Sequence, residues 1–116
     1  MEKLELIIKT LDKKKGTDID CLKVDDLTIL ADYFVICTGT SNTHVKSLSD
    51  ELEYVLGQNG FEPISVTGKA SGWILLDYGD VIVDVFTADQ REHYALERLW
   101  ADAKQVDISG MLETND

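Results

Sequence analysis

Hydrophobic residues recur along this chain with two different spacings, which predict helices in some segments and strands in others. Residues 3–15 place leucine and isoleucine on one face of a helix, and Gly16 interrupts the pattern. Residues 45–56 repeat the helical spacing shortly after a Thr-Ser-Asn run, whose side-chain oxygens can cap a helix. Residues 88–103 carry a third stripe, so we expect three helices.

The remaining hydrophobic segments have the pattern of strands. Residues 17–24 alternate, and residues 31–39 form a nearly continuous apolar run that is typical of a central strand. Residues 61–68 contain the single proline, which suits the start of a strand or the edge of a sheet. Residues 72–86 form two strands joined by a tight turn. Strands and helices mixed in this order predict a single α/β (α+β mixed) domain with one mixed sheet and packed helices.

The hairpin of residues 72–86 has two unlike faces, whether its two-residue turn lies at 78–79 or at 79–80. One face is entirely apolar, with Tyr78 leaning toward it at the turn, and must face the core: Ile74, Leu76, Val81, Val83 and Val85. The other face mixes apolar and acidic residues: Trp73, Leu75, Asp77, Asp80, Ile82, Asp84 and Phe86. A turn at 78–79 would place Asp77 opposite Asp80, and like charges in that position destabilise a strand pair by up to about 1 kcal/mol. Something should therefore compensate the acids.

A bound metal ion could compensate them. Carboxylates on adjacent strands bind Mg²⁺ in phosphoryl-transfer enzymes, so a metal-dependent nucleotidyltransferase using Asp77 and Asp80 is the alternative function. Residues 39–41 offer the turn before a helix that such an enzyme needs. However, the acids of the hairpin are three and four residues apart, there is no Walker-type phosphate loop, and His44 and His93 have no evident nucleophile beside them. No catalytic, cofactor or metal site is therefore expected.

Cations supplied by protein could also compensate the acids, in two ways. A basic protein partner could meet the aspartates while Trp73 and Leu75 supply apolar anchors, which is how interface hot spots are built. Alternatively, Lys69, Arg91 or Arg98 could neutralise the acids within the chain, and a helix could cover Trp73. The hydrophobic pattern alone does not separate a partner's cations from those of the chain itself.

The charge of the chain narrows the choice of partner. It carries 11 basic and 22 acidic residues, a formal net charge of −11. Phosphate backbones and anionic membrane surfaces repel such a chain, so direct nucleic-acid recognition and membrane binding are not expected. No apolar run reaches the roughly 18 residues of a membrane span, and the N-terminal segment lacks the pattern of a secretory signal. Cys21 and Cys37 lack metal-ligand spacing and are expected as buried residues in a reducing cytoplasm.

Three segments carry a resemblance to a known family: residues 31–48 (ADYFVICTGTSNTHVKSL), the hairpin 72–86 (GWILLDYGDVIVDVF) and residues 91–103 (REHYALERLWADA). Together they resemble the Iojap-like family of ribosomal silencing factors. The resemblance covers roughly residues 3–104, so residues 1–104 are expected to form the family domain. Residues 105–116 lose periodicity and are expected to form a loose acidic tail.

The resemblance implies a fold related to nucleotidyltransferases but without their catalytic residues, and no catalysed reaction. It also implies a cytoplasmic protein that binds a basic protein of the large ribosomal subunit, large-subunit protein fourteen in bacteria, at the subunit interface. Members of the family block joining of the small subunit and so repress translation when nutrients are short. Self-association as a homodimer off the ribosome stays open.

The family's binding positions carry over onto the hairpin and favour compensation of the acids by a basic partner. They correspond to Trp73, Leu75, Asp77, Tyr78 and Asp80. Tyr78 is the exception within this set, because the strand pattern turns it toward the core. Relatives often carry histidine where this chain has Asp84, which is therefore expected only as a residue at the rim of the interface.

Overall fold

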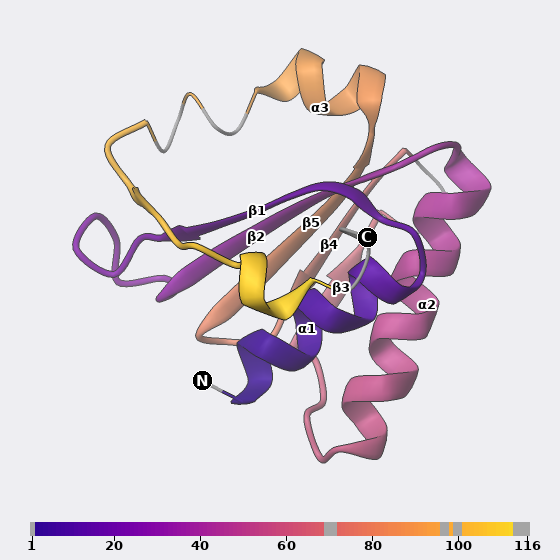
Figure 1. The fold of residues 1–116 in the computed structure, drawn as a ribbon, viewed down its shortest axis with the longest axis horizontal. Coiled ribbons are helices and arrows are strands. Elements are labelled where there is room, and N and C mark those ends of the chain that lie inside the picture. The colour runs from indigo at the N-terminus through magenta and orange to yellow at the C-terminus, as the bar shows by residue number, and fades with distance from the viewer. Residues whose placement is uncertain (1, 69–71, 96–97, 99–100, 113–116) are drawn as a thin grey trace.

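The structure is a computed structural model that describes residues 2–68, 72–95, 98 and 101–112 (Figure 1). Its elements, in chain order, are α1 (Glu2–Lys13), β1 (Thr17–Lys23), β2 (Tyr33–Gly39), α2 (Asn42–Gln58), β3 (Ser65–Thr67), β4 (Trp73–Asp77), β5 (Val81–Thr87), α3 (Ala88–Tyr94), β6 (Lys104–Gln105) and the 3-10 helix η1 (Ser109–Met111). The predicted order of helices and strands is confirmed.

The strands of the described residues form one sheet in the order β3-β4-β5-β2-β1-β6. Only β2 and β5 pair in parallel among these strands, and the other neighbours are antiparallel. The predicted α/β domain with a mixed sheet is therefore confirmed. The short β3 begins after Pro63 and lies at the edge of the sheet, where a proline next to a strand is tolerated.

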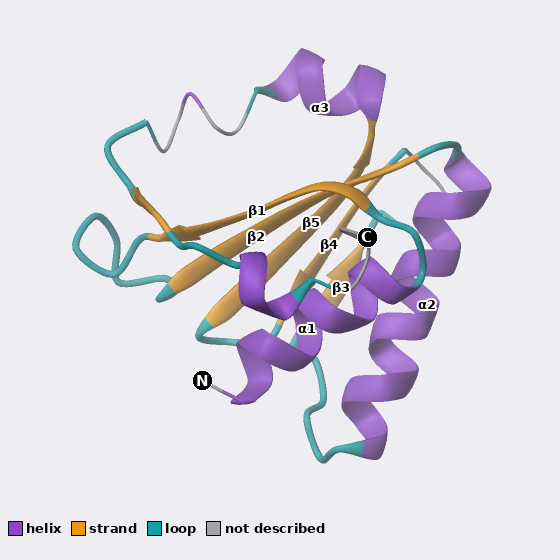
Figure 2. Ribbon diagram, viewed as in Figure 1, coloured by secondary structure: helices purple, strands orange, loops and turns teal. Residues whose placement is uncertain are grey.

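One face of the sheet is covered by α1 and α2, which lie side by side (Figure 2). The main core lies beneath them and contains the predicted apolar face of the hairpin: Ile74, Leu76, Val81, Val83 and Val85. Each of these five side chains is fully buried. Ser41 caps α2 by accepting a hydrogen bond from the backbone N–H of His44, as the Thr-Ser-Asn run predicts.

The opposite face of the sheet is covered less completely. A smaller cluster of buried side chains lies there: Leu22, Val24, Ala31, Phe34, Ile36 and Phe86. α3 reaches over part of this face, away from α1 and α2 (Figure 1), and Ala103 packs against the same cluster. No helix in the described parts of the chain is long and apolar enough to cross a membrane.

The predicted end of the third helix differs from the structure. α3 ends at Tyr94 instead of reaching residue 103, because Ala95 adopts a left-handed conformation in which its N–H bonds to the carbonyl of Arg91. Most of the predicted stripe beyond it lies outside the described residues: Leu96, Leu99 and Trp100.

Residues 104–112 are not a loose tail. Lys104 and Gln105 form β6 and pair with β1, and Ile108 is buried in the main core. A single buried isoleucine and a two-residue strand are too short to produce a periodic pattern, which is why the sequence did not indicate them.

Candidate protein-binding face

The hairpin uses the second of the two predicted registers. Asp77 pairs with Ile82, so the two turn residues are Gly79 and Asp80, and the backbone N–H of Tyr78 donates to the carbonyl of Val81 at 2.9 Å. Gly79 has a φ of 89°, the left-handed conformation that glycine adopts at the first position of such a turn. Asp77 therefore does not lie opposite Asp80, and the repulsion expected from the other register is avoided.

Three cross-strand rows make up the face that points away from α1 and α2. They are Thr38–Phe86–Trp73, then Asp20–Ile36–Asp84–Leu75–Thr67, then Leu22–Phe34–Ile82–Asp77–Ser65. β4 contributes Trp73, Leu75 and Asp77, all of them half-buried. The structure thus brings three of the five predicted partner-binding residues into one line on an incompletely covered part of the sheet.

Trp73 is held from several sides. Its ring stacks on Phe86, with centroids 4.9 Å apart, and meets the ring of Tyr94 from α3 at 4.4 Å. Its indole Nε1–H donates a hydrogen bond to Oδ1 of Asp84 at 2.9 Å. The prediction that a helix packs against Trp73 is thus correct for α3, while part of the indole stays accessible.

Asp84 is a buried residue, which corrects its expected place at the rim. Its side chain is 1% exposed, and Oδ2 has no hydrogen-bond partner among the described residues. Burial raises the pKa of Asp84 to about 6, while the hydrogen bond from Trp73 opposes that rise. Along β5, the side chains of Ile82, Asp84 and Phe86 point to the same face of the sheet, because residues two apart on a strand share a face. On that face Asp84 lies opposite Leu75 of β4.

The other two acids of the hairpin are satisfied within the chain. Oδ1 of Asp77 accepts the backbone N–H of Gly79 at 2.8 Å. Asp80 accepts from Nζ of Lys3 at 2.7 Å, and the same ammonium donates to the carbonyl of Tyr78 at 3.1 Å. Lys3, which was not among the three expected cations, therefore compensates Asp80, while Lys69 lies outside the described residues.

Tyr78 lies on the opposite side of the hairpin from Trp73. Its ring is 4% exposed and belongs to the main core. Burial raises the pKa of its hydroxyl above the usual range. The strand pattern placed Tyr78 correctly, and this position separates its side chain from the line formed on β4.

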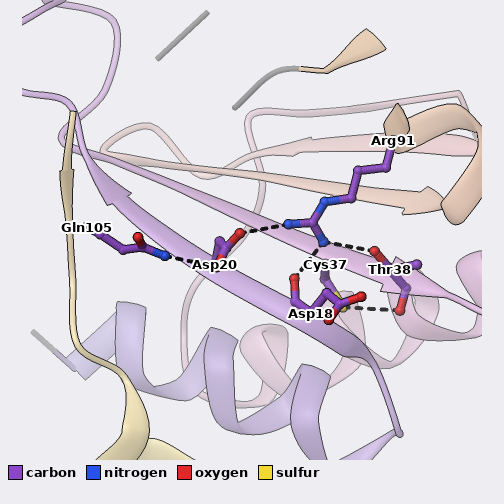
Figure 3. A network of polar contacts seen from close by, with 6 residues as sticks. All are labelled: Asp18, Asp20, Cys37, Thr38, Arg91 and Gln105. Carbon is purple, nitrogen blue, oxygen red and sulfur yellow. Dashed lines mark hydrogen bonds and ion pairs between the residues drawn. The ribbon is translucent and has the colours of Figure 1, made fainter. Parts of the chain in front are cut away.

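Arg91 docks α3 onto β1 and β2 of the sheet (Figure 3). Its guanidinium donates to Oδ2 of Asp20 and to Oγ1 of Thr38, both at 2.8 Å, and to the carbonyl of Asp18. Gln105 donates to the other oxygen of Asp20 at 3.1 Å. This network joins α3, β1, β2 and β6, and so fixes the helix that carries Tyr94 against Trp73.

Asp18 and Asp20 have Asp-x-Asp spacing on β1, a pair of acids that was not anticipated as a candidate site. Arg91 and Gln105 occupy the carboxylate of Asp20. Across the described residues, no group of three or more metal-ligating side chains comes together.

The loop between β1 and β2 adds apolar surface that the strand and helix patterns did not indicate. Leu27, Ile29 and Leu30 are all exposed. The loop is tied to the hairpin, because the backbone N–H groups of Asp32 and Tyr33 both donate to the carbonyl of Asp80. The apolar loop and the turn of the hairpin therefore adjoin each other.

Comparison with known proteins identifies the family. The family model described as "Ribosomal silencing factor during starvation" matches residues 1–116. The ribosomal silencing factor RsfS of Halalkalibacterium halodurans is 37% identical over 112 residues, which is 96% of each chain. The chain therefore belongs to the ribosomal silencing factor family, whose name marks its members as regulators of translation.

Solved and more distant relatives agree with this assignment. A crystal structure of a Chromobacterium violaceum protein superposes with a TM-score of 0.84 at 36% identity, covering 86% of this chain and 84% of the other. A mouse protein named "Mitochondrial assembly of ribosomal large subunit protein 1" is 28% identical over 101 residues, which is 84% of this chain and 44% of the mouse protein.

Proposed function

We propose that this chain binds a basic protein of the large ribosomal subunit and thereby prevents the small subunit from joining. The observation that carries the proposal is the line of Trp73, Leu75 and Asp77 on β4, half-buried on a sheet face that α3 covers only in part. Asp80 lies at the turn beyond this line, where it pairs with Lys3 of α1. The partner that the resemblance implies is large-subunit protein fourteen, and the site of action is the cytoplasm.

Apolar and acidic groups have separate tasks in this proposal. Trp73 supplies a large aromatic anchor whose orientation is fixed before binding, so that little conformational entropy is lost on association. Leu75 extends the apolar contact. The net charge of −11 steers the chain toward a basic protein and away from exposed RNA phosphates.

Silencing then needs no chemical step. A folded domain bound at the interface between subunits occupies the surface that the small subunit requires. The name of the mouse relative refers to the large subunit, which supports that subunit as the binding target. The family assignment supports action on translation.

Co-sedimentation with separated ribosomal subunits tests the proposal. We expect the purified chain to sediment with large subunits and not with small ones, and to reduce the formation of complete ribosomes when small subunits are added. Sedimentation with neither subunit, or unimpaired subunit joining at saturating protein, would contradict it.

Replacement of the aromatic anchor locates the site. Trp73→Ala is expected to weaken binding to large subunits at least about 30-fold while the chain stays folded, because truncation of a central hot-spot aromatic costs about 2 kcal/mol or more. Tyr54→Ala is the matched control, since Tyr54 is an exposed aromatic on α2, which covers the other face of the sheet. Equal binding by the two variants would move the site away from β4.

Charge reversal tests the electrostatic part. Asp77→Lys is expected to weaken association about tenfold at low salt and less at high salt, because mobile ions screen charges at the rim of an interface. Asp50→Lys makes the same change in net charge on α2. Equal losses by both variants would indicate that only the total charge matters, and a loss independent of salt would indicate packing.

A further inference from the structure

The face proposed to bind the partner has a buried carboxylate beneath it. Asp84 lies opposite Leu75, is 1% exposed, and receives the indole N–H of Trp73 on Oδ1 at 2.9 Å. Its second oxygen is buried without a hydrogen-bond partner among the described residues. A buried acceptor left in this state costs free energy, so the position demands a functional or structural reason.

The geometry supplies such a reason in the orientation of Trp73. Contacts with the rings of Phe86 and Tyr94 restrain the plane of the indole, but a half-turn about the Cβ–Cγ bond keeps that plane while moving Nε1 to the other edge. The hydrogen bond to Asp84 selects one of these two orientations, because only one of them points Nε1 at Oδ1. Asp84 therefore determines which edge of the indole remains accessible.

We propose that Asp84 is a positioning residue for partner binding, which fixes the indole of Trp73 and couples association with the basic partner to ionisation of its own carboxyl group. This inference rests on the proposed function, since it assigns the control of the same site. A basic protein brought close to Asp84 favours the carboxylate over the protonated acid. Binding then releases a proton, and by linkage the affinity increases as the pH rises through the titration of Asp84.

The surroundings of Asp84 decide which controls are needed. Burial is the main cause of its raised pKa of about 6, with the hydrogen bond from Trp73 acting in the opposite direction. The described charged or titratable residues of the elements around this face include Asp77 on β4, Asp18 and Asp20 on β1, Asp89, Arg91, Glu92, His93 and Tyr94 on α3, and Arg98 after it. His93 is an exposed histidine on α3, so His93→Gln serves as a control.

The first experiment needs no partner. In the ¹⁵N-labelled full chain, the indole N–H signal of Trp73 is assigned by its absence from Trp73→Phe. We expect this signal to shift with pH around a midpoint near 6, to lose that shift in Asp84→Asn, and to keep it in Asp12→Asn, which alters another buried aspartate, in α1. A Trp73 signal that ignores pH in the unaltered chain would overturn the coupling.

The second experiment measures binding to large ribosomal subunits at pH 5.5 and pH 7.5. The unaltered chain is expected to bind about threefold more tightly at pH 7.5, and His93→Gln to keep that difference. Asp84→Asn has an amide oxygen that can still accept a hydrogen bond from the indole. At pH 7.5 its affinity should lie within about threefold of that of the unaltered chain, but its affinity should not differ between the two pH values. Asp84→Leu, which cannot accept this bond, should bind about tenfold more weakly at both pH values, and its spectrum shows whether it is folded.

The outcomes separate this inference from the function on which it rests. If Trp73→Ala loses binding while both Asp84 variants keep the affinity and pH dependence of the unaltered chain, the role of Asp84 is refuted and the proposed site stands. If Trp73→Ala binds as the unaltered chain does, the proposed site itself is refuted, whatever the Asp84 variants do.

Discussion

The two faces of the sheet are built under different constraints. Beneath α1 and α2, the core-facing residues of the hairpin are apolar side chains with no exposed surface: Ile74, Leu76, Val81, Val83 and Val85. On the other face, the same two strands carry Trp73, Leu75, Asp77 and Asp84, and α3 covers only part of them. The first face is packed like an ordinary protein core. The second face combines apolar and acidic side chains and is covered only in part.

This difference separates the face that stabilises the fold from the face that we propose binds the partner. A core face gains from every buried methyl group, and each polar atom there would cost free energy. A face that must later receive a partner has to keep apolar and charged groups accessible, so it gives up part of that gain. Substitutions on adjacent residues of one strand should therefore separate the two roles.

The largest expected contrast is between Leu76 and Leu75, neighbours on β4 that point to opposite faces. Leu76→Ala should lower the free energy of unfolding by about 3–4 kcal/mol, because it opens a cavity in the packed core. Leu75→Ala removes a half-buried side chain and should cost about 1 kcal/mol. Urea denaturation of both variants measures the contrast, and similar losses of stability would remove the distinction between the faces.

The next largest expected effect is the change in unfolding free energy with pH that Asp84 produces. Asp84 has a pKa of about 6 in the folded chain, above the ordinary value of 3.8, so the folded state binds its proton more tightly than the unfolded state does. The contribution of Asp84 to stability is therefore complete below about pH 4 and is lost as the pH rises through 6. The loss amounts to about 2–3 kcal/mol.

Denaturation of the unaltered chain and of Asp84→Asn from about pH 4 to about pH 8 measures this contribution. As the pH rises, the unfolding free energy of Asp84→Asn should increase relative to that of the unaltered chain. A constant difference across the range would mean that Asp84 titrates alike in the folded and unfolded states.

The smallest expected effect concerns the ion pair at the turn. Lys3→Ala should lower the unfolding free energy by less than about 1 kcal/mol, because the side chains of Lys3 and Asp80 are 20% and 38% exposed and water screens their attraction. Lys9→Ala, which breaks the more exposed pair with Glu5, should cost less still. A large loss for Lys3→Ala would show that the turn depends on this cation more than its exposure suggests.

Much of the fold could be predicted because its signals are local. The stripes of α1 and α2, the cap at Ser41 and the alternation of the hairpin each involve residues close in sequence, and each is confirmed. The register of the hairpin could not be chosen from the sequence. The two possible turns give strand registers that differ by two residues, and both registers place the same side chains on each face. The end of α3 at Tyr94 was missed because an alanine in the left-handed conformation gives no signal in the sequence.

The candidate site was predictable only in outline. The mixed character of the second face and the positions of Trp73, Leu75 and Asp77 follow from alternation along β4. Long-range contacts did not follow: Lys3 reaches Asp80 across 77 positions of the chain, and Arg91 binds Asp20 on β1. The burial of Asp84 was also hidden, because it depends on how closely α3 and its neighbours cover β5.

The pairing of β6 with β1 sets the order in which the chain can finish folding during its own synthesis. β1 is made early, and its outer edge stays without a partner until residues 104 and 105 have been added. An open strand edge is a template for strands from other chains. A nascent chain of this silencing factor therefore lacks the β6 partner of Leu22 and Lys23 for most of its translation, and β6 covers that part of the edge once it emerges from the ribosome.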